Sequence, residues 1–326
     1  MRQFLAVLGS LKLALAGMLM LLSVILYDLK IASLPPIWMA LCLALLCLNL
    51  LMVVVVRPQF RRQPALLMFH LCLAAVAGLA ALQSLVVFDA RIEQAENQPF
   101  DVENVEIITR GPWHADQLHE VRFRQGTVTV DYRPELRRGQ TLSTIYQQLA
   151  GTQHSTIFGD TVSYQDRGYR FVTTPNKGYA LTLVWRDDNG GQISGSIHMP
   201  SYPLQEWDQR QQWRTPAGET VALMLELPPV PTAVAWQLSS DNFDGRVLLV
   251  RADGSELELP RNKAVALVGG SLELTWVGLW IGYSIEYNPL LPWLFASAAL
   301  GVAALGWHFW RNPPRFRSGG DLANAV

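Results

Sequence analysis

Four apolar stretches, each long enough to cross a bilayer as a helix, constrain the fold of this chain more than any other feature. They lie at about residues 5–27, 37–56, 65–88 and 287–310 of the 326-residue sequence, and a bilayer core needs about 20 apolar residues in a helix. The first stretch lacks an Ala-x-Ala cleavage site, which favours a helix over a signal peptide. The sequence therefore predicts an integral membrane protein with four transmembrane α-helices, three before and one after a long intervening segment.

The composition excludes several classes of function. Half of the residues are hydrophobic and only 16% are charged, against roughly a quarter in soluble domains. The formal net charge of −1 lacks the basic excess that nucleic-acid binding requires. The three cysteines, Cys42, Cys47 and Cys72, all lie in apolar stretches, so they form neither a disulfide framework nor a CxxC site. Any redox cofactor must be held by other side chains.

The arginines predict the orientation of the spans. Three arginines and no acid lie between residues 57 and 62, and three arginines with one acid lie in the tail 311–326. Basic residues beside spans are retained in the cytoplasm, so both termini are expected inside the cell inner (plasma) membrane and residues 89–286 outside it. This outer segment holds 25 acidic and 17 basic residues, which favours a protein partner over anionic lipid.

The outer segment has the pattern of a mainly antiparallel β domain, a sandwich or an open barrel. Residues 121–132 alternate apolar and polar on either side of Gln125 and Gly126, which predicts a hairpin there. One short helix is expected at 141–149, and the proline-rich stretch 227–231 is expected to separate two sub-sheets. Further glycine turns are expected at 189–191, 244–245, 253–254 and 269–270, because glycine supplies the positive φ of tight turns.

The turn at 253–254 also predicts which side chains face the core. Leu248 and Val250 are expected opposite Leu257 and Leu259, with the intervening glutamates toward water.

Short stretches in and beside the apolar segments carry a resemblance to a known family. They are SLKLAL at 10–15, FHL at 69–71 with Gly78, NPLLPWL at 288–294 and WHFWR at 307–311, with a looser match in PNKGY at 175–179. Together with the layout of three spans, an outer domain and a returning span, they resemble the ResB family of cytochrome c biogenesis proteins, also called CcsB. The chain differs in its shorter outer domain and in LYDLK at 26–30, where the family usually has Gly-Thr and Pro-Gln.

The resemblance implies a role in the System II pathway, in which ResB works with a second membrane protein, CcsA, to move haem outward and attach it to apocytochrome c. A CcsA-like protein and apocytochrome c are the implied partners, and haem is the implied cofactor. The tryptophan-rich haem-presenting motif belongs to CcsA. The WVGLW stretch at 276–280 lacks its Trp-Asp ending and is interpreted as strand core. The resemblance thus implies an assembly factor or a haem-lyase subunit more than a stand-alone enzyme, with no catalytic residue assigned.

His70 is the first candidate for binding haem. An ionisable side chain inside a membrane span is costly and usually functional, and imidazole suits iron. The resemblance implies that this third-span histidine ligates haem opposite a histidine of the partner. The alternative is a neutral histidine that hydrogen-bonds to a helix carbonyl.

His308 is the second candidate. It lies between Trp307 and Trp310 near the inner end of the fourth span, as in an interfacial aromatic belt. At 1.5 Å per residue, its depth differs from that of His70 by about 5 Å, which allows one haem to contact both.

Other sites have less support. His114 and His119 are expected to be loop histidines on the surface rather than metal ligands, and no hydrolase or phosphate-binding motif is found. Asn49, mid-way through the second span, is expected to hydrogen-bond between helices. The competing hypothesis is a structural or regulatory membrane protein without haem, whose outer β domain binds an extracytoplasmic protein.

Overall fold

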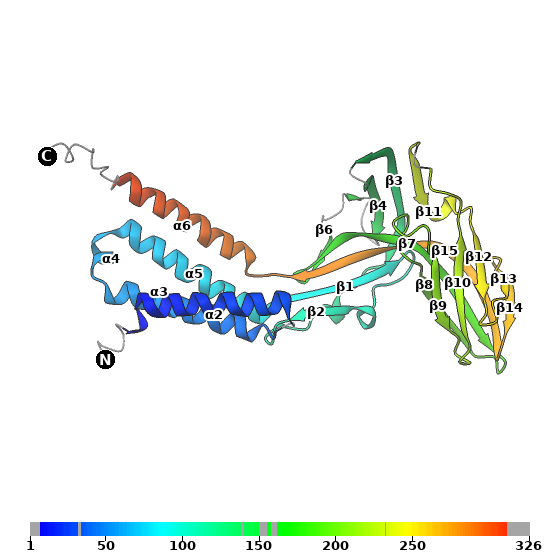
Figure 1. Cartoon of the computed structure of the whole chain (residues 1–326), viewed down its shortest axis with the longest axis horizontal. Coiled ribbons are helices and arrows are strands. Elements are labelled where there is room, and N and C mark those ends of the chain that lie inside the picture. Colours follow the sequence, from blue (N-terminus) through cyan, green and yellow to red (C-terminus); the bar gives the residue numbers. More distant parts are fainter. Residues whose placement is uncertain are drawn as a thin grey trace, which may run out of the picture. The chain divides into compact units, whose positions relative to one another are not determined.

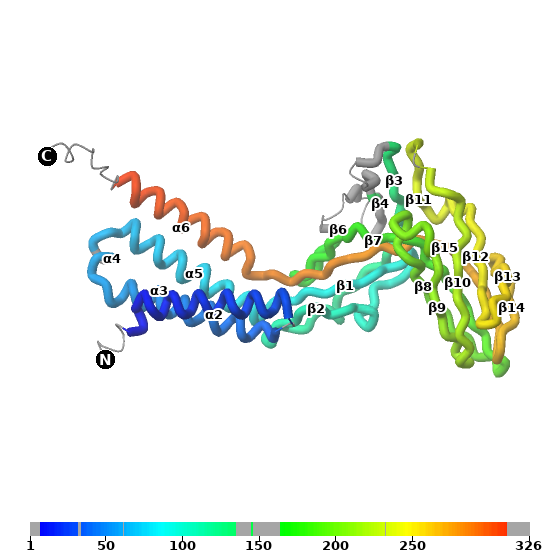
Figure 2. Tube along the Cα trace, viewed as in Figure 1, coloured from blue at the N-terminus to red at the C-terminus, as the bar shows by residue number. Residues whose placement is uncertain are grey.

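The chain forms two compact units in the computed structural model. The structure describes residues 7–31, 34–137, 140–149, 155–157, 162–231 and 233–311, so the predicted tail lies outside the described residues except for Arg311 (Figures 1 and 2). A helical unit comprises Met1–Phe88, Thr109–Ala115 and Tyr287–Val326. A β-rich unit comprises Asp89–Ile108 and Asp116–Glu286.

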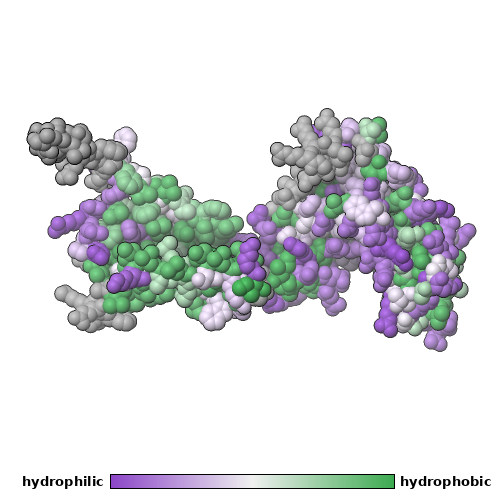
Figure 3. All heavy atoms as spheres, viewed as in Figure 1, coloured by the Kyte–Doolittle hydropathy of each residue, from purple (hydrophilic) through white to green (hydrophobic). Residues whose placement is uncertain are grey.

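The helical unit contains the four long apolar helices that the sequence predicts. All four are long and apolar enough to cross a membrane, and hydrophobic residues dominate their visible surface (Figure 3). Helix α5 ends at Val86, two residues before the end expected from the sequence, because Phe88 already begins strand β1. The helices are α2 (Leu11–Lys30), α3 (Ile37–Val56), the short α4 (Gln59–Arg62), α5 (Pro64–Val86) and α6 (Leu291–Arg311).

Small residues let these helices approach closely. Helix α3 packs against α2 and α5, and α5 packs against α6. A Cβ atom added at Gly78 would lie 3.3 Å from the sulfur of Cys47 on α3, and one at Gly301 would lie 3.2 Å from Cβ of Cys72 on α5. Gly78 of α5 therefore packs against α3, whereas Gly301 of α6 packs against α5 beside Cys72, so the two glycines do not contact each other.

Asn49 ties α3 to the segment that begins α2. Its side chain is 3% exposed, and its Nδ2 donates hydrogen bonds to the backbone oxygens of Leu8 at 2.6 Å and Ser10 at 3.1 Å. The expectation that this amide hydrogen-bonds to another helical segment is confirmed.

The segment Thr109–Ala115 belongs to the helical unit, although the sequence places it in the outer domain. The backbone N–H of Gly111 donates to the oxygen of Val87, and that of Trp113 donates to the oxygen of Leu85, both at 2.8 Å. The last carbonyls of a helix have no partner within the helix, so this segment satisfies the end of α5. Such a pairing between distant backbone groups leaves no pattern in the sequence.

The described strands of the β-rich structure form three sheets. The largest has the order β2-β1-β15-β7-β6, with β8 also paired to β7 and β14 to β15; the others have the orders β13-β12-β10-β9 and β11-β3-β4-β5 (Figure 1). The proline-rich stretch connects β10 and β11 of two different sheets.

The strands have these bounds: β1 (Phe88–Ala95), β2 (Glu106–Arg110), β3 (Gln125–Arg137), β4 (Gln140–Leu149), β5 (Ser155–Ile157), β6 (Val162–Asp166), β7 (Tyr169–Asp187), β8 (Gln192–His198), β9 (Arg210–Arg214), β10 (Thr220–Glu226), β11 (Trp236–Ser239), β12 (Arg246–Val250), β13 (Glu256–Glu258), β14 (Ala264–Leu267) and β15 (Gly270–Tyr287). Short 3-10 turns lie at Val102–Asn104, Leu118–Glu120 and Ser240–Asn242.

Three of the predicted glycine turns are confirmed. Gly190, Gly254 and Gly269 have φ angles of 89°, 81° and 76°, and they lie in the turns β7-β8, β12-β13 and β14-β15. Gly245 lies in the link before β12 and has no positive φ, so the turn expected at 244–245 is wrong.

Two predicted elements in the first part of the β-rich unit are also wrong. Residues 141–149 form strand β4, paired with β3 and β5, because tertiary pairing overrides weak helix preference. No hairpin turns at Gln125 and Gly126, since they are the first two residues of strand β3. The N–H of Gln125 instead donates to the oxygen of Gln98 at 3.0 Å.

The β12-β13 hairpin has a register one residue away from that expected. Leu248 pairs with Glu258 and Leu249 with Leu257. Val247 and Leu249 are buried in place of Leu248, whereas Val250 and Leu259 are buried as expected. A one-residue slip moves side chains to the opposite face. The glutamates Glu256 and Glu258 are exposed as expected.

Candidate functional site

His70 lies on α5, the third apolar helix, with its ring held in one orientation. Its Nδ1 is 3.0 Å from the backbone oxygen of Leu66, one turn earlier. A carbonyl oxygen only accepts, so Nδ1 carries the proton and Nε2 of the neutral ring keeps its lone pair. In the part of the chain that the structure describes, Nε2 has no hydrogen-bond partner.

Aromatic rings complete the surroundings of His70. The ring of Phe60, from the short helix α4, lies 4.4 Å away, edge to face, and that of Phe69 lies 5.5 Å away. Phe60 is 2% exposed, so the short helix α4, which forms the corner between α3 and α5, is packed against this part of α5. His70 is about 9 Å along the helix axis from Pro64, where α5 begins. The helix-carbonyl contact is thus present, and it leaves one ring nitrogen for a ligand.

His308 lies on α6 at a different place in the helical unit. It lines a cavity of about 300 Å³ together with Trp307 and Arg311 of α6 and with Arg62, Gln63, Pro64 and Ala65 at the start of α5. A volume of 300 Å³ is at the lower end of small-molecule sites. His70 is not among the residues that line this cavity, and one haem shared by the two histidines stays a prediction.

His114 is buried, contrary to the surface position that the sequence predicts. It is 8% exposed, its Nδ1 is 3.1 Å from the backbone oxygen of Val86, and its ring stacks on Phe88 at 4.8 Å. Tyr287, just before α6, contacts the same ring edge to face at 4.9 Å. His114 therefore packs where α5 ends and the chain returns toward α6.

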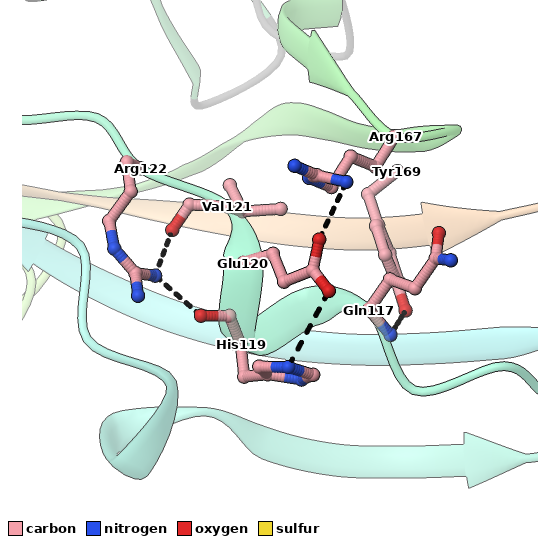
Figure 4. A network of polar contacts seen from close by, with 7 residues as sticks. All are labelled: Gln117, His119, Glu120, Val121, Arg122, Arg167 and Tyr169. Atoms are coloured by element: carbon pink, nitrogen blue, oxygen red, sulfur yellow. Dashed lines mark hydrogen bonds and ion pairs between the residues drawn. The ribbon is translucent and has the colours of Figure 1, made fainter.

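His119 is an exposed loop histidine as expected, in a network of surface contacts (Figure 4). Glu120 lies between Arg167, at 2.6 Å, and His119, at 3.8 Å. Arg122 donates to the backbone oxygens of His119 and Val121. Among the described residues, no three His, Cys, Asp or Glu side chains are grouped to hold a metal ion.

The β-rich unit contains a polar groove that the sequence gives no sign of. Its volume is about 1,090 Å³, and strands β1, β7, β8 and β15 line it. Glu93 of β1 contacts His198 of β8 at 3.0 Å, and the His198 ring stacks on Trp280 at 5.7 Å. Trp280 itself is 3% exposed and donates from Nε1 to the oxygen of Met199, as expected for strand core.

Two buried charged groups were not among the expected site residues. Glu96 is 1% exposed, and burial raises the pKa of its carboxyl although several hydrogen bonds lower it. Lys177 is 7% exposed, and burial lowers the pKa of its ammonium to about 8. Both belong to the β-rich unit.

Neither a scan against models of known protein families nor a search of curated proteins finds a match for this chain.

Proposed function

We propose that this chain is a ResB-like membrane subunit that handles haem during the assembly of c-type cytochromes, together with a CcsA-like partner. The observation that carries the proposal is the orientation of His70 on the third apolar helix. Its Nδ1 is fixed by Leu66 and its Nε2 is open, as in histidines that bind metals through one nitrogen and are oriented through the other. A second haem ligand would come from the partner.

The residues present fit one half of a haem site. Imidazole is a common ligand of haem iron, and the partly exposed ring of Phe69 beside His70 would provide apolar packing for a porphyrin edge. When bound, haem supplies the porphyrin to which apocytochrome thiols are joined. This chain contributes orientation and the exclusion of water rather than an acid or base.

Thiol chemistry has to come from another protein. The sequence has three cysteines, and Cys42, Cys47 and Cys72 all lie on α3 and α5. The β-rich unit therefore has no thiol with which to reduce the cysteines of an apocytochrome.

The competing function is a membrane protein without haem whose β-rich unit binds an extracytoplasmic protein. The large polar groove of the β-rich unit favours protein binding in either case. The two functions differ at His70, which has no task in the second.

The first prediction concerns the absorbance of the full chain, co-expressed with a CcsA-like partner and purified in detergent. We expect a Soret band with α and β peaks after reduction, and His70→Ala is expected to lower haem per protein about tenfold or more because an axial ligand is lost. His119→Ala, at an exposed histidine, is the matched control. His308→Ala tests whether His308 contacts the same haem as His70. A colourless complex, or a His70→Ala protein with an unchanged spectrum, contradicts the proposal.

The second prediction concerns topology. A phosphatase reporter fused after Phe88 is expected to be active only outside the cell membrane, and one fused after Arg317 is expected to be inactive, because arginines beside the spans stay in the cytoplasm. Reporter activity normalised to fusion-protein level is the measurement. The reverse pattern would contradict the proposed orientation.

A further inference from the structure

The polar groove of the β-rich unit runs along an open edge of its largest sheet. Strand β8 pairs with β7, and no described strand pairs with its other side. Ser194, Gly195 and Ser196 of β8 line the groove, and a Cβ atom added at Gly195 would meet no atom within 4 Å. Side chains of a strand point alternately to its two faces, so the sheet face at Gly195 is uncovered, and Ser194 and Ser196 line the groove on the other face.

The hydrogen bonds at the two ends of the β7-β8 pair define which residues of β8 point outward. The N–H of Met199 donates to the oxygen of Tyr179, and the N–H of Asp187 donates to the oxygen of Gly191, both at 2.9 Å. In an antiparallel pair, hydrogen-bonded and non-bonded residues alternate. Residues 191, 193, 195, 197 and 199 thus bond to β7.

The even-numbered residues of β8 consequently direct their backbone groups away from β7. Ser194 and Ser196, which both line the groove, each direct an N–H and a C=O away from β7, and these groups have no backbone partner among the described residues. An exposed strand edge of this kind is a template for pairing with another chain. β8 has the sequence QISGSIH, without the proline or lysine that often protects edges.

The charge of the groove selects the chain that would pair there. Its lining includes the carboxylates of Glu93, Asp101 and Glu106, against the guanidinium of Arg91 and the imidazole of His198, which contacts Glu93. An acidic polar groove beside open backbone groups suits an extended basic segment, with main-chain bonds giving affinity and side chains giving charge selection.

We propose that β8 binds an extended segment of a basic polypeptide by strand addition, at the backbone groups of Ser194 and Ser196. The inference rests on the proposed function, in which an extracytoplasmic polypeptide, the apocytochrome, must be held outside the membrane. The strand-addition proposal identifies the surface that would hold the apocytochrome and specifies that the bound segment is basic.

The test uses the full chain in a nonionic detergent and a fluorescein-labelled heptapeptide in which lysine alternates with threonine. Binding is followed by fluorescence anisotropy. Ser194→Pro removes an outward N–H and keeps the bonds to β7, since proline is tolerated at a strand edge. Ser194→Ala is the matched control, because it keeps the N–H. We expect Ser194→Pro to weaken binding about tenfold relative to Ser194→Ala, and Ser196→Pro to act alike.

Two further peptides separate the elements of the proposal. A peptide with glutamate in place of lysine is expected to bind at least about tenfold more weakly, and a backbone N-methylated peptide is expected not to bind. Equal binding by Ser194→Pro and Ser194→Ala, or by the N-methylated peptide, overturns strand addition. A chain dimer that Ser194→Pro dissociates overturns the choice of occupant in favour of a second copy.

The haem proposal fails or succeeds separately. The peptide assay needs no haem, and the absorbance of the same preparations reports on His70 alone. A colourless protein that binds the lysine peptide contradicts the haem function and supports strand addition at β8. A haem-containing protein that does not bind the peptide supports the haem function and contradicts strand addition.

Discussion

Replacing Glu96 with alanine is expected to destabilise the β-rich unit by about 4 kcal/mol, because it leaves buried backbone donors without acceptors. The Glu96 carboxylate accepts from the N–H of Val128 at 2.5 Å and from the N–H of Leu279 at 2.8 Å. These donors belong to strands β3 and β15 of different sheets. The carboxylate thus joins two sheets through their main chains.

Thermal unfolding of the full chain in detergent, followed by the loss of β-sheet circular dichroism, measures this effect. Glu96→Gln keeps one acceptor oxygen but places an amide N–H₂ against a backbone N–H, so about half the loss is expected. Glu103→Ala is the control at an exposed glutamate, with a change within about 0.5 kcal/mol. If Glu96→Ala melts like Glu103→Ala, the carboxylate does not connect the sheets.

Glu96 illustrates what the sequence can and cannot predict. Ile92 and Gln94 of β1 and Glu96, which follows the strand in a turn, lie at alternate positions, and all three are buried. Glu96 was nevertheless not among the residues predicted to be buried. Its partners Val128 and Leu279 are 32 and 183 residues away, and no local pattern specifies such long-range pairs.

The same division holds for the rest of the fold. The apolar helices and the glycine turns β7-β8, β12-β13 and β14-β15 follow from length, hydropathy and positive φ, which are local properties. The errors concern tertiary pairing: strand β4 was expected to be a helix, and β3 begins at Gln125, where a turn was expected.

Within the candidate site, the sequence indicates the residue but not its contacts. His70 is conspicuous as an ionisable group in an apolar run, while its bond to Leu66 and its packing against Phe60 depend on the α4 corner. The open edge of β8 depends on which strands pair with it. The amino-acid composition does not predict which strand edges remain unpaired.

Replacing Lys177 with methionine is expected to stabilise the β-rich unit at pH 7. Lys177 is 7% exposed, its Nζ donates to the oxygen of Pro175 at 3.2 Å, and it lies 5.6 Å from the centre of the Tyr132 ring. No carboxylate pairs with it among the described residues. Because burial alone lowers the pKa of this ammonium to about 8, the charged form is costly in the folded state.

The direction of the pH dependence follows from that shift. Below pH 8 the lysine is protonated in both states, and the folded state bears the cost of the buried charge. Between the folded pKa of about 8 and the ordinary value of 10.5, the unfolded state binds more protons, so stability rises with pH. The pKa values of Tyr132, Tyr179 and Tyr202 are raised by burial, and their contribution to stability is lost above about pH 10.

Urea unfolding between pH 7 and 9.5 isolates the lysine from these tyrosines. The free energy of unfolding of the wild-type chain is expected to rise by about 2 kcal/mol across this range. Lys177→Met is expected to be about 2 kcal/mol more stable than the wild type at pH 7, with the lost cation–π contact already subtracted. Its stability is expected not to change with pH in this range. Lys263→Met, at an exposed lysine, is expected to keep the wild-type slope. A Lys177→Met protein that is less stable at pH 7, or that keeps the slope, would mean that the ammonium is stabilised by its aromatic neighbours and that its burial carries no net cost.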